Sequence, residues 1–494
     1  MKKLSNLLKW IDNNLIQVLL ALFIFIIPLY PKLPFHMINY TYIAVRLEDF
    51  YVMFLLLVFG IQIIRKKVTL NKLFLIPFCL FWIAAFASFF YGYYVSHTIE
   101  IQHLGLMHAA RRIEYMAVFF VATSIIKTRK SFLFFLGLNL FVLFLVLGYG
   151  VGQKFLGWPA VQTMNPEYAK GYLLYLTPEA RVSSTFAGHY DLAAYLVFLI
   201  PIVAAFYFYK KNLYYFGLLL FSIFILVLTA SRISYAAFVV SLFPFLLFLR
   251  KPKHFVIVLL ITILFTFTSK NLTSRFKRTF QVKQIFVNQN TGQVVVPQKI
   301  TAKEVPAGTF YVGINANLST DPELLRQRLL DDLREQEKKK GNKLSNEQEK
   351  QLVASMEANL KPVNTVVSDI SFATRLQVEW PRAVKAFLSN PVLGTGPSSI
   401  TEATDNDYLR AIGEFGLFGS LTFALIFFLI FKKVWVHVKK APEKEKVVYF
   451  GFLFGLFGLL LNAGYIDVFE ASKVAFFFWM MAGLFIGSLS HEKA

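Results

Sequence analysis

The chain has a single cysteine, no recognisable cleavage site after its basic N-terminal segment and no visible internal repeat. Its single cysteine, Cys79, excludes an intramolecular disulfide, and no zinc cluster can be built on it. The basic segment Met1 to Trp10 leads into an apolar run without a small-residue cleavage site, so we expect it to remain as a signal anchor. No repeat with a period of about 20 to 50 residues is visible. Disulfides, zinc clusters and sequence repeats therefore give no information on the fold, and the apolar segments have to supply it.

Hydrophobic residues are abundant. They make up 56% of the 494 residues, including 55 phenylalanines, and the mean hydropathy is +0.55. One soluble core cannot bury that much apolar surface, so most of it must face lipid. The sequence therefore predicts an all-α polytopic membrane protein with about twelve spanning helices. The predicted spans are residues 15–30, 50–64, 73–94, 110–126, 131–150, 190–209, 213–229, 233–249, 255–268, 410–431, 447–463 and 474–489.

Basic residues set the predicted orientation. With the N-terminus inside, the inside connections hold clusters such as Arg65 to Lys67, Arg250 to Lys253 and Lys439 to Lys446, whereas the short outside loops hold fewer. This positive-inside bias predicts a plasma-membrane protein with both termini in the cytoplasm. The net charge of +22 then indicates topology and contact with anionic membrane lipids, and no nucleic-acid partner is predicted.

Polar residues gather at the predicted outer ends of several spans. His97, His103 and His108 are not spaced by four residues, so an interfacial amphipathic helix is preferred there over a metal site. Arg181 and His189 lie at the entry to the sixth span, and for His189 alone an interfacial cap is the preferred interpretation.

Arg232 lies between the seventh and eighth spans, in the sequence LTASRISYAAF. The short connection holds this arginine at the membrane surface or slightly below it, on the side that disfavours basic residues. It is either a snorkelling anchor or a ligand for an anion, and the sequence leaves both readings open.

After the ninth predicted span, a long outside segment covers residues 269–409. Residues 281–365 look like an inserted α+β module. Two short strands flank an Asn-Thr-Gly turn, a charged helix is predicted over 322–340, and a Ser-x-x-Gln capping box opens another over 345–360. Nothing in the module resembles a catalytic constellation, so we interpret it as a peripheral cap or docking surface.

The last part of this segment is predicted to be the catalytic loop. Arg375, Trp380 and Phe387 recur at roughly helical spacing, which indicates an amphipathic helix over the membrane, kinked at Pro381. The sequence NPVLGTG ends this helix in a tight turn, and TDNDYL leads into the tenth span. The predicted organisation is a membrane domain (1–268), the inserted module (269–367), the catalytic loop (368–409) and a second membrane domain (410–494).

At these motifs the chain resembles the O-antigen ligase and polymerase superfamily of bacterial envelope glycosyltransferases. The resemblance is carried by TASR (229–232), by the arginine-to-tryptophan helix followed by NPVLGTG, and by DNDYLRAIGEFGLFG. The sequences RLED, RRIEY and RVSSTFAGHYDLAAYL also look like this family. The match covers about 15–268 and 370–489 and leaves the inserted module outside it.

The resemblance implies a membrane enzyme that takes an oligosaccharide from a polyprenyl (undecaprenyl) diphosphate carrier at the outer face of the plasma membrane. It passes this sugar to a hydroxyl of a glycan or glycolipid, as in lipopolysaccharide and other cell-envelope polysaccharide biosynthesis. The protein must then neutralise the leaving diphosphate, orient the acceptor and remove one proton. No cofactor and no metal are implied. A chain-length regulator or other envelope assembly proteins are candidate partners.

Arginine suits the diphosphate because its planar fork binds phosphate oxygens in pairs. We expect Arg232 and Arg375 to hold the diphosphate, with Arg181 and Arg382 as further candidates. His189, Asn406 and Tyr408 are expected to contact substrate elsewhere, and Tyr408 has the alternative of an interfacial anchor. The candidate site residues, including the two candidate bases, are thus Asp405, Asp407, Arg232, Arg375, Arg181, Arg382, His189, Asn406 and Tyr408.

Asp405 is the first candidate for the proton acceptor and Asp407 competes with it. Ligases of this family look to carry a histidine where this chain has Asp405, which favours the polymerase-like branch. A carboxylate serves as a base if burial raises its pKa towards neutrality. The spelling DND also matches an acidic metal-binding motif, but two carboxylates alone rarely define a site for a hard cation.

Two rival functions remain at this stage. A mannosyltransferase-like enzyme that uses a lipid-phosphate sugar would place its essential acids in the first outside loop, where Glu48 and Asp49 lie. A transporter or flippase of lipid-linked oligosaccharide would carry charges at the midplane of several helices and paired broken spans, whereas the charges here collect at the outer mouths.

Overall fold

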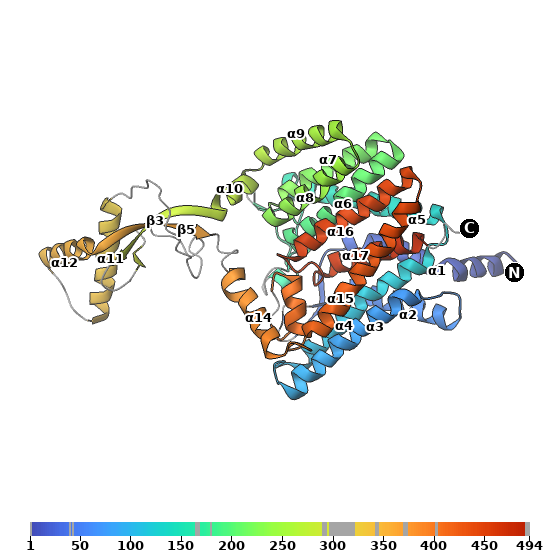
Figure 1. Cartoon of the computed structure of the whole chain (residues 1–494), viewed down its shortest axis with the longest axis horizontal. Helices are drawn as coiled ribbons and strands as arrows, with labels where there is room; N and C mark the ends of the chain where they lie inside the picture. Colours follow the sequence, from blue (N-terminus) through green and yellow to red (C-terminus); the bar gives the residue numbers. More distant parts are fainter. Residues whose placement is uncertain are drawn as a thin grey trace. The chain divides into compact units, whose positions relative to one another are not determined.

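The computed structural model describes residues 2–38, 41, 44–163, 168–177, 180–288, 294–295, 322–340, 345–368, 374–400 and 404–489. The chain divides into two compact units (Figure 1). The first contains residues Met1–Thr273 and Arg382–Ala494, and the second contains Ser274–Pro381. Each unit is described separately below.

The first unit is a bundle of long apolar helices, and each of the predicted spans falls on a helix of its own. Its helices are α1 (Lys2–Leu29), α2 (Leu47–Ile64), α3 (Lys72–Phe90) with the π-helical turn η1 (Tyr91–Val95), α4 (Gln102–Ile125), α5 (Arg129–Phe155), the short 3-10 turn η2 (Tyr168–Lys170), α6 (His189–Lys210), α7 (Leu213–Leu228), α8 (Arg232–Phe248), α9 (Pro252–Thr268), α14 (Trp380–Ser389), α15 (Asp407–Lys440), α16 (Glu443–Ala463) and α17 (Ser472–Ser488).

The composition of these helices confirms a membrane protein. Among the described residues, seven helices are long and apolar enough to cross a membrane, and α7, α8, α9 and α17 are shorter apolar helices. The predicted helical membrane architecture is therefore confirmed, while the count of twelve spans remains a prediction.

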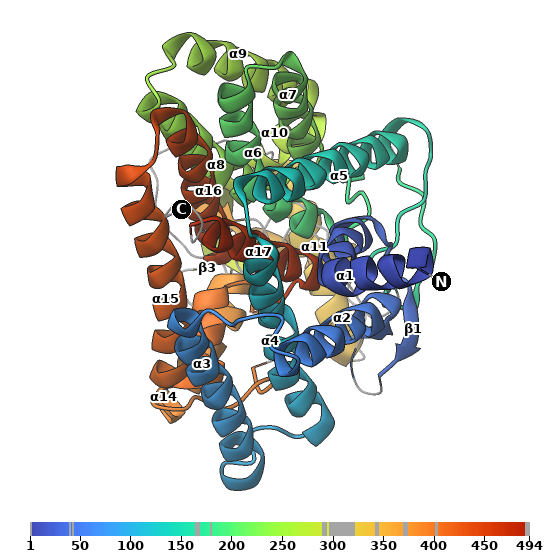
Figure 2. The same cartoon turned by 90° about the vertical axis from the view of Figure 1, so that its right-hand side faces the viewer.

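Helix α17 lies in the middle of the bundle, between α4, α15, α6 and α1 (Figure 2). It is buried along its whole length, as expected for a helix that is apolar on all sides. Gly483 and Gly487, one turn apart, let α17 approach α4 closely, because a Cβ at Gly483 would meet the Phe119 carbonyl oxygen at 2.4 Å. Gly451 and Gly455 of α16 give the same close approach to α6.

Several helices begin at polar residues that satisfy their first backbone N–H groups. The side chains of Asn71, Thr128 and Asn212 accept such hydrogen bonds at the starts of α3, α5 and α7. Asn406 does the same for α15. The last of these caps lies in the TDNDYL motif and contributes to the candidate site.

A small hairpin precedes α2. Strand β1 (Pro34–Met37) pairs antiparallel with β2 (Ala44–Arg46), with Pro34 opposite Arg46. Arg46 is the last residue of β2, so the hairpin positions the arginine of the RLED motif immediately before α2.

The second unit has the predicted α+β content. Strand β3 (Phe280–Asn288) is central and pairs antiparallel with β4 (Val294–Val295) and with β5 (Leu360–Ser368). The two strands predicted around the Asn-Thr-Gly turn are confirmed, while the turn itself lies outside the described residues. Strand β5 was not predicted.

Both predicted helices of the module are present. Helix α11 (Pro322–Lys340) has the predicted bounds, and α12 (Asn346–Ala358) begins at the predicted Ser345 cap. They pack through Leu325, Leu329, Leu333 and Val353. The unit also holds helix α10 from Ser274 onward (Lys270–Thr279) and the π-helical turn η3 (Arg375–Glu379), which ends two residues before Pro381.

Candidate active site

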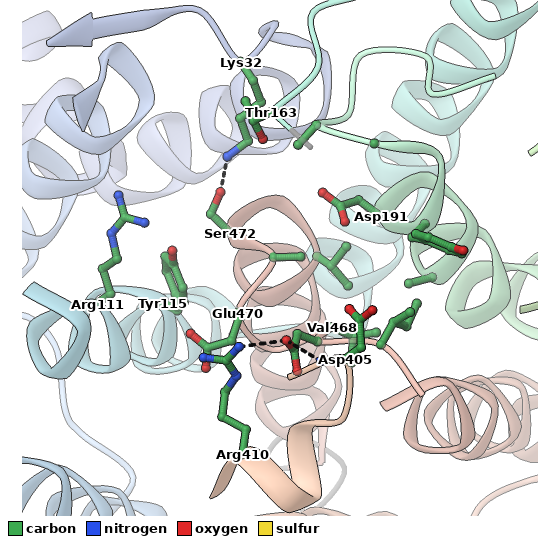
Figure 3. Close-up of a pocket in the computed structure, with 18 of the residues that line it drawn as sticks. Lys32, Arg111, Tyr115, Thr163, Asp191, Asp405, Arg410, Val468, Glu470 and Ser472 are labelled. Atoms are coloured by element: carbon green, nitrogen blue, oxygen red, sulfur yellow. Dashed lines mark hydrogen bonds and ion pairs between the residues drawn. The ribbon is translucent and has the colours of Figure 1, made fainter. Parts of the chain in front are cut away.

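A cavity of about 370 Å³ opens at one end of the helix bundle of the first unit (Figure 3). It collects residues from six separate parts of the chain: the α1–β2 region, α4, the connection after α5, the entry to α6, the start of α15 and the loop between α16 and α17. Its polar lining residues are Lys32, Arg46, His108, Arg111, Tyr115, Thr163, Tyr190, Asp191, Asp405, Arg410, Asp467, Glu470 and Ser472.

The TDND turn is held from behind by Asp467, a residue of the α16–α17 loop. Its carboxylate accepts hydrogen bonds from the backbone N–H groups of Thr404, Asp405 and Asn406 at 3.1, 3.0 and 3.0 Å. Arg410 donates to the same carboxylate at 2.9 Å. Burial alone would raise the pKa of Asp467, but Arg410 and the backbone N–H donors outweigh it and hold the pKa below its usual range.

Asp407 makes the reciprocal connection. Its buried carboxylate accepts hydrogen bonds from the backbone N–H groups of Val468 at 2.7 Å and Phe469 at 3.2 Å. The two aspartates therefore fasten the 404–407 turn and the 467–469 turn to each other. These contacts place the carboxylate of Asp407 among structural hydrogen bonds.

Asn406 and Tyr408 also make structural contacts. The Asn406 side-chain oxygen caps α15 by accepting from Tyr408 and Leu409 N–H, and its amide donates to the Gly464 carbonyl at 2.9 Å. The Tyr408 hydroxyl donates to the Leu460 carbonyl at 2.6 Å. Both contacts tie the start of α15 to the end of α16.

Asp405 differs from its neighbours because it lines the cavity (Figure 3). Its backbone has a positive φ of 51°, a conformation that aspartate tolerates better than most residues. The three N–H bonds to Asp467 hold the turn in this conformation. The arrangement presents the carboxyl group of Asp405 to the cavity while the rest of the motif is anchored.

A buried ion network lies beneath the turn and links α4, α15 and the loop between α16 and α17. Glu414 of α15 is fully buried and contacts Arg410 at 3.3 Å and Arg112 of α4 at 3.7 Å. Arg112 also pairs with Glu470, and its guanidinium lies 5.1 Å from the Phe415 ring centroid. Arg410 completes the chain of charges by pairing with Asp467. The RRIEY and LRAIGEFG motifs therefore meet in one charged cluster.

The NPVLGTG turn has a defined role in this arrangement. Helix α15 is broken at Gly416, which has φ 60° and ψ −163°. The turn packs into the break, where Thr395 N–H donates to Gly413 O at 3.0 Å and Gly396 N–H donates to Glu414 O at 2.9 Å. A Cβ at Gly416 would meet the Val392 backbone at 2.4 Å, so only glycine permits this approach.

The cavity is lined by charged groups of both signs. Arg111 lies on one side, and Asp191 and Asp405 lie on the opposite side (Figure 3). Lys32 at the upper edge is neutralised by Glu48, with 2.6 Å between its Nζ and the carboxylate, and it also contacts Ser472. Burial lowers the pKa of the Lys32 amine, and the charge of Glu48 opposes that shift.

The other predicted site residues are not gathered at this cavity. Arg181 bonds His189 at 2.6 Å and lies over the Tyr190 ring, and neither Arg181 nor His189 is among the lining residues. Val182 N–H donates to Leu228 O at 3.2 Å, so the segment of Arg181 lies beside the turn that precedes Arg232.

The remaining predicted arginines have separate positions. Arg232 is the first residue of α8 and is not a lining residue of the cavity. Arg382 is exposed and donates to the Ile400 carbonyl at 3.3 Å. Arg375 is buried within η3 and belongs to the second unit. The proposed diphosphate role of these arginines remains a prediction.

Several residues of the site were not recognised from sequence. Asp467 and Glu470 lie in the short connection YIDVFEAS between α16 and α17, and Arg46 and Arg111 were noted only as parts of motifs. One signal was available: two acids in a short outside connection between spans face the same side as the TDND turn in the predicted topology. Among the described residues, no group of three or more histidine, cysteine, aspartate or glutamate side chains is arranged to hold a metal ion.

The fold and the cavity define a polytopic helical membrane protein with a charged pocket at one end of its bundle. Residues 216–424, somewhat less than half of the chain, match the family model described as O-antigen ligase, which supports the resemblance to the O-antigen ligase and polymerase superfamily that the motifs indicate. The matched range contains Asp405 and Arg410, whereas Arg46, Arg111 and Asp467 lie outside it. No curated protein matches the chain.

Proposed function

We propose that this protein transfers an oligosaccharide from a polyprenyl diphosphate carrier to a hydroxyl group of a glycan or glycolipid. The O-antigen ligase family match supports the glycosyltransferase class. The observation that carries the proposal is the position of Asp405, a carboxylate held at the wall of a cavity that has Arg111 on its opposite side.

The proposed chemistry is a single displacement. Asp405 takes the proton of the acceptor hydroxyl as its oxygen attacks the anomeric carbon of the donor sugar. The bond from that carbon to the diphosphate oxygen breaks, and the polyprenyl diphosphate leaves with both electrons of the bond. Guanidinium groups stabilise the charge that grows on the diphosphate, so the protein supplies positioning and electrostatic stabilisation.

Asp405 is preferred to Asp407 as the base. Asp407 already accepts two backbone hydrogen bonds and fixes the α16–α17 loop. Asp405 takes part in the turn through its backbone N–H and lines the cavity with its side chain. A base has to reach the acceptor hydroxyl, and this arrangement gives that access to Asp405.

We further propose that the enzyme acts at the outer face of the bacterial plasma membrane, with both termini in the cytoplasm. The positive-inside distribution of lysine and arginine supports this orientation. A polymerase-like activity is favoured over ligation because an aspartate occupies position 405, where ligases of the family look to carry histidine.

The test is transfer by the purified full-length protein from a lipid-linked oligosaccharide in vitro. A ladder of glycan lengths indicates polymerisation, and a single transfer to the final anchor indicates ligation. We expect Asp405→Ala to abolish either product. Intact activity in both Asp405→Ala and Arg232→Ala would show that the assigned site is wrong, and movement of the lipid-linked glycan across a vesicle membrane without any product would favour a flippase.

A mannosyltransferase-like enzyme is the second candidate, because it would use acids of the first outside loop, where Glu48 and Asp49 lie. Glu48 pairs with Lys32, a lining residue of the cavity. In the structure Glu48 is paired with Lys32, and Asp49 accepts the Arg46 backbone N–H at 2.8 Å. Both contacts explain these acids structurally. Activity that survives replacement of both residues would exclude this candidate.

A further inference from the structure

The cavity wall formed by β2 and α4 carries two guanidinium groups that converge on one backbone oxygen. Arg46 donates from Nη1 and Arg111 donates from Nη2 to the carbonyl of Ala44, each at 3.4 Å. Arg46 is only 5% exposed, and its Nε has no hydrogen-bond partner among the described residues. A guanidinium has five N–H donors, so one long bond leaves most of them without an acceptor.

The two acids that follow Arg46 in the sequence are engaged elsewhere. Glu48 pairs with Lys32 at 2.6 Å, and an oxygen of Asp49 accepts the Arg46 backbone N–H. Within the described part of the chain, neither Arg46 nor Arg111 forms an ion pair with a carboxylate. The charges of Glu48 and Asp49 act on both guanidinium groups, and that of Glu114 acts on Arg111, without a direct ion pair. An anionic ligand in the cavity would accept charge-assisted hydrogen bonds directly from these groups.

The geometry selects the chemistry of that ligand. Both guanidinium groups reach the same carbonyl oxygen, so their donating nitrogens lie within twice that bond length of each other. Two oxygens of one diphosphate can span this separation and accept charge-assisted hydrogen bonds from both groups. The aspartates on the opposite wall disfavour a second anion there and leave space for a neutral, hydroxyl-bearing group.

We propose that Arg46 and Arg111 form the binding site for the diphosphate of the lipid-linked donor. This assignment rests on the proposed function and adds to it the residues that hold the leaving group. It places the diphosphate on the wall opposite Asp405, so that the anomeric carbon lies between the two walls. Each arginine stabilises the leaving group and is expected to be needed for both donor binding and turnover.

The experiment measures ligand binding apart from catalysis. The purified full-length protein in phosphatidylcholine nanodiscs is titrated with inorganic pyrophosphate and with geranylgeranyl diphosphate, and binding is followed by calorimetry. We expect Arg46→Gln and Arg111→Gln each to weaken binding of both probes by about tenfold to a hundredfold, since each removes charge-assisted hydrogen bonds. Arg111→Lys should retain only part of the affinity. Lysine keeps the positive charge but cannot donate the paired hydrogen bonds of a planar guanidinium.

Arg65→Gln is the matched control, because Arg65 is an exposed arginine paired with Asp12 outside the cavity. It should bind both probes as the wild-type protein does. Melting temperatures with and without pyrophosphate separate lost binding from lost folding: a folded variant that has lost the site melts cooperatively but gains no stability from pyrophosphate.

Three results would overturn the assignment. The first is wild-type affinity in folded Arg46→Gln and Arg111→Gln proteins, and the second is loss of binding in Arg232→Gln alone. The third is displacement of both probes when phosphatidylglycerol replaces part of the phosphatidylcholine, which would make the site a lipid-headgroup site. If the protein binds diphosphate through these arginines but transfers no sugar, the proposed function fails and the anion site stands.

Discussion

Asp407 and Asp467 each fix the backbone of the turn that carries the other. Asp467 accepts three N–H groups from residues 404–406, and Asp407 accepts N–H groups from Val468 and Phe469. A connection between two helices and the start of a third are thereby held as one unit. The consequence is functional: this pair fixes the backbone of Asp405, whose side chain lines the cavity.

The first prediction separates Asp405 from Asp407. Asp405→Ala should lower glycosyl transfer by about a hundredfold or more, the range expected for loss of a general base, while the melting temperature stays near that of the wild type. Asp407→Ala should lower the free energy of unfolding by about 2 kcal/mol or more, because two buried N–H groups lose their acceptor. Transfer assays and thermal unfolding in detergent test both. Equal loss of stability in the two variants would contradict the distinction.

The second prediction concerns acid. The pKa of Asp467 is lower in the folded protein than its ordinary value of 3.8. The stabilisation from this carboxylate is therefore complete above about pH 4 and is lost as the pH falls through the folded-state pKa. We expect Asp467→Asn to have a lower melting temperature than the wild type at pH 7, and the difference to shrink towards pH 3. A difference that grows on acidification would contradict this assignment.

The third prediction concerns the buried ion network. Glu414→Gln should reduce the free energy of unfolding by about 3 to 5 kcal/mol, because Arg112 and Arg410 lose a shared, fully buried counter-charge. Glu443→Gln is the control, since its pair with Lys446 is at the surface and its own side chain is 89% exposed. Unfolding measured in parallel should show little change for the control.

The fourth prediction concerns the break in α15. Gly416→Ala should destabilise the protein by about 1 to 3 kcal/mol or more, because alanine disfavours a φ of 60° and its Cβ would meet the Val392 backbone. Gly137→Ala on α5, where a Cβ would meet nothing within 4 Å, should be neutral or slightly stabilising. Melting temperatures of the two variants provide the comparison.

The fifth prediction concerns metal. We expect glycosyl transfer to be unchanged after treatment with EDTA and dialysis, because arginines are proposed to neutralise the leaving group. Loss of transfer on chelation, with recovery on adding Mg²⁺ or Mn²⁺, would contradict this prediction and indicate that the DND sequence binds a metal ion.

Much of the fold follows from local patterns. Apolar runs located the long apolar helices of the first unit, and the Ser345 capping box located the start of α12. The Asn406 cap at the start of α15 follows from the same chemistry of short polar side chains. Strand β5 was not predicted from the sequence. It pairs with β3, which lies about seventy residues or more earlier in the chain, and no local pattern encodes a pairing over that separation.

Local sequence patterns predicted only part of the candidate site. Asp405 stands out in the TDNDYL motif, but Asp467 reaches it only because α16 and α17 return to the start of α15. Arginines near span ends look alike in sequence, since interfacial anchors and ligands share the same composition. Arg46 and Arg111 are distinguished from Arg181 and Arg232 by the cavity they line.

The sequence alone determined the class of this protein, the identity of its helices and its relation to a family of envelope glycosyltransferases, because hydropathy, capping and short motifs act within a few residues. Only the tertiary structure decided which charges meet. The pairing of Asp407 with the 467–469 turn, and the convergence of Arg46 and Arg111 on Ala44, depend on segments brought together by helix packing. Charge interactions act through space, so their partners were settled by the bundle.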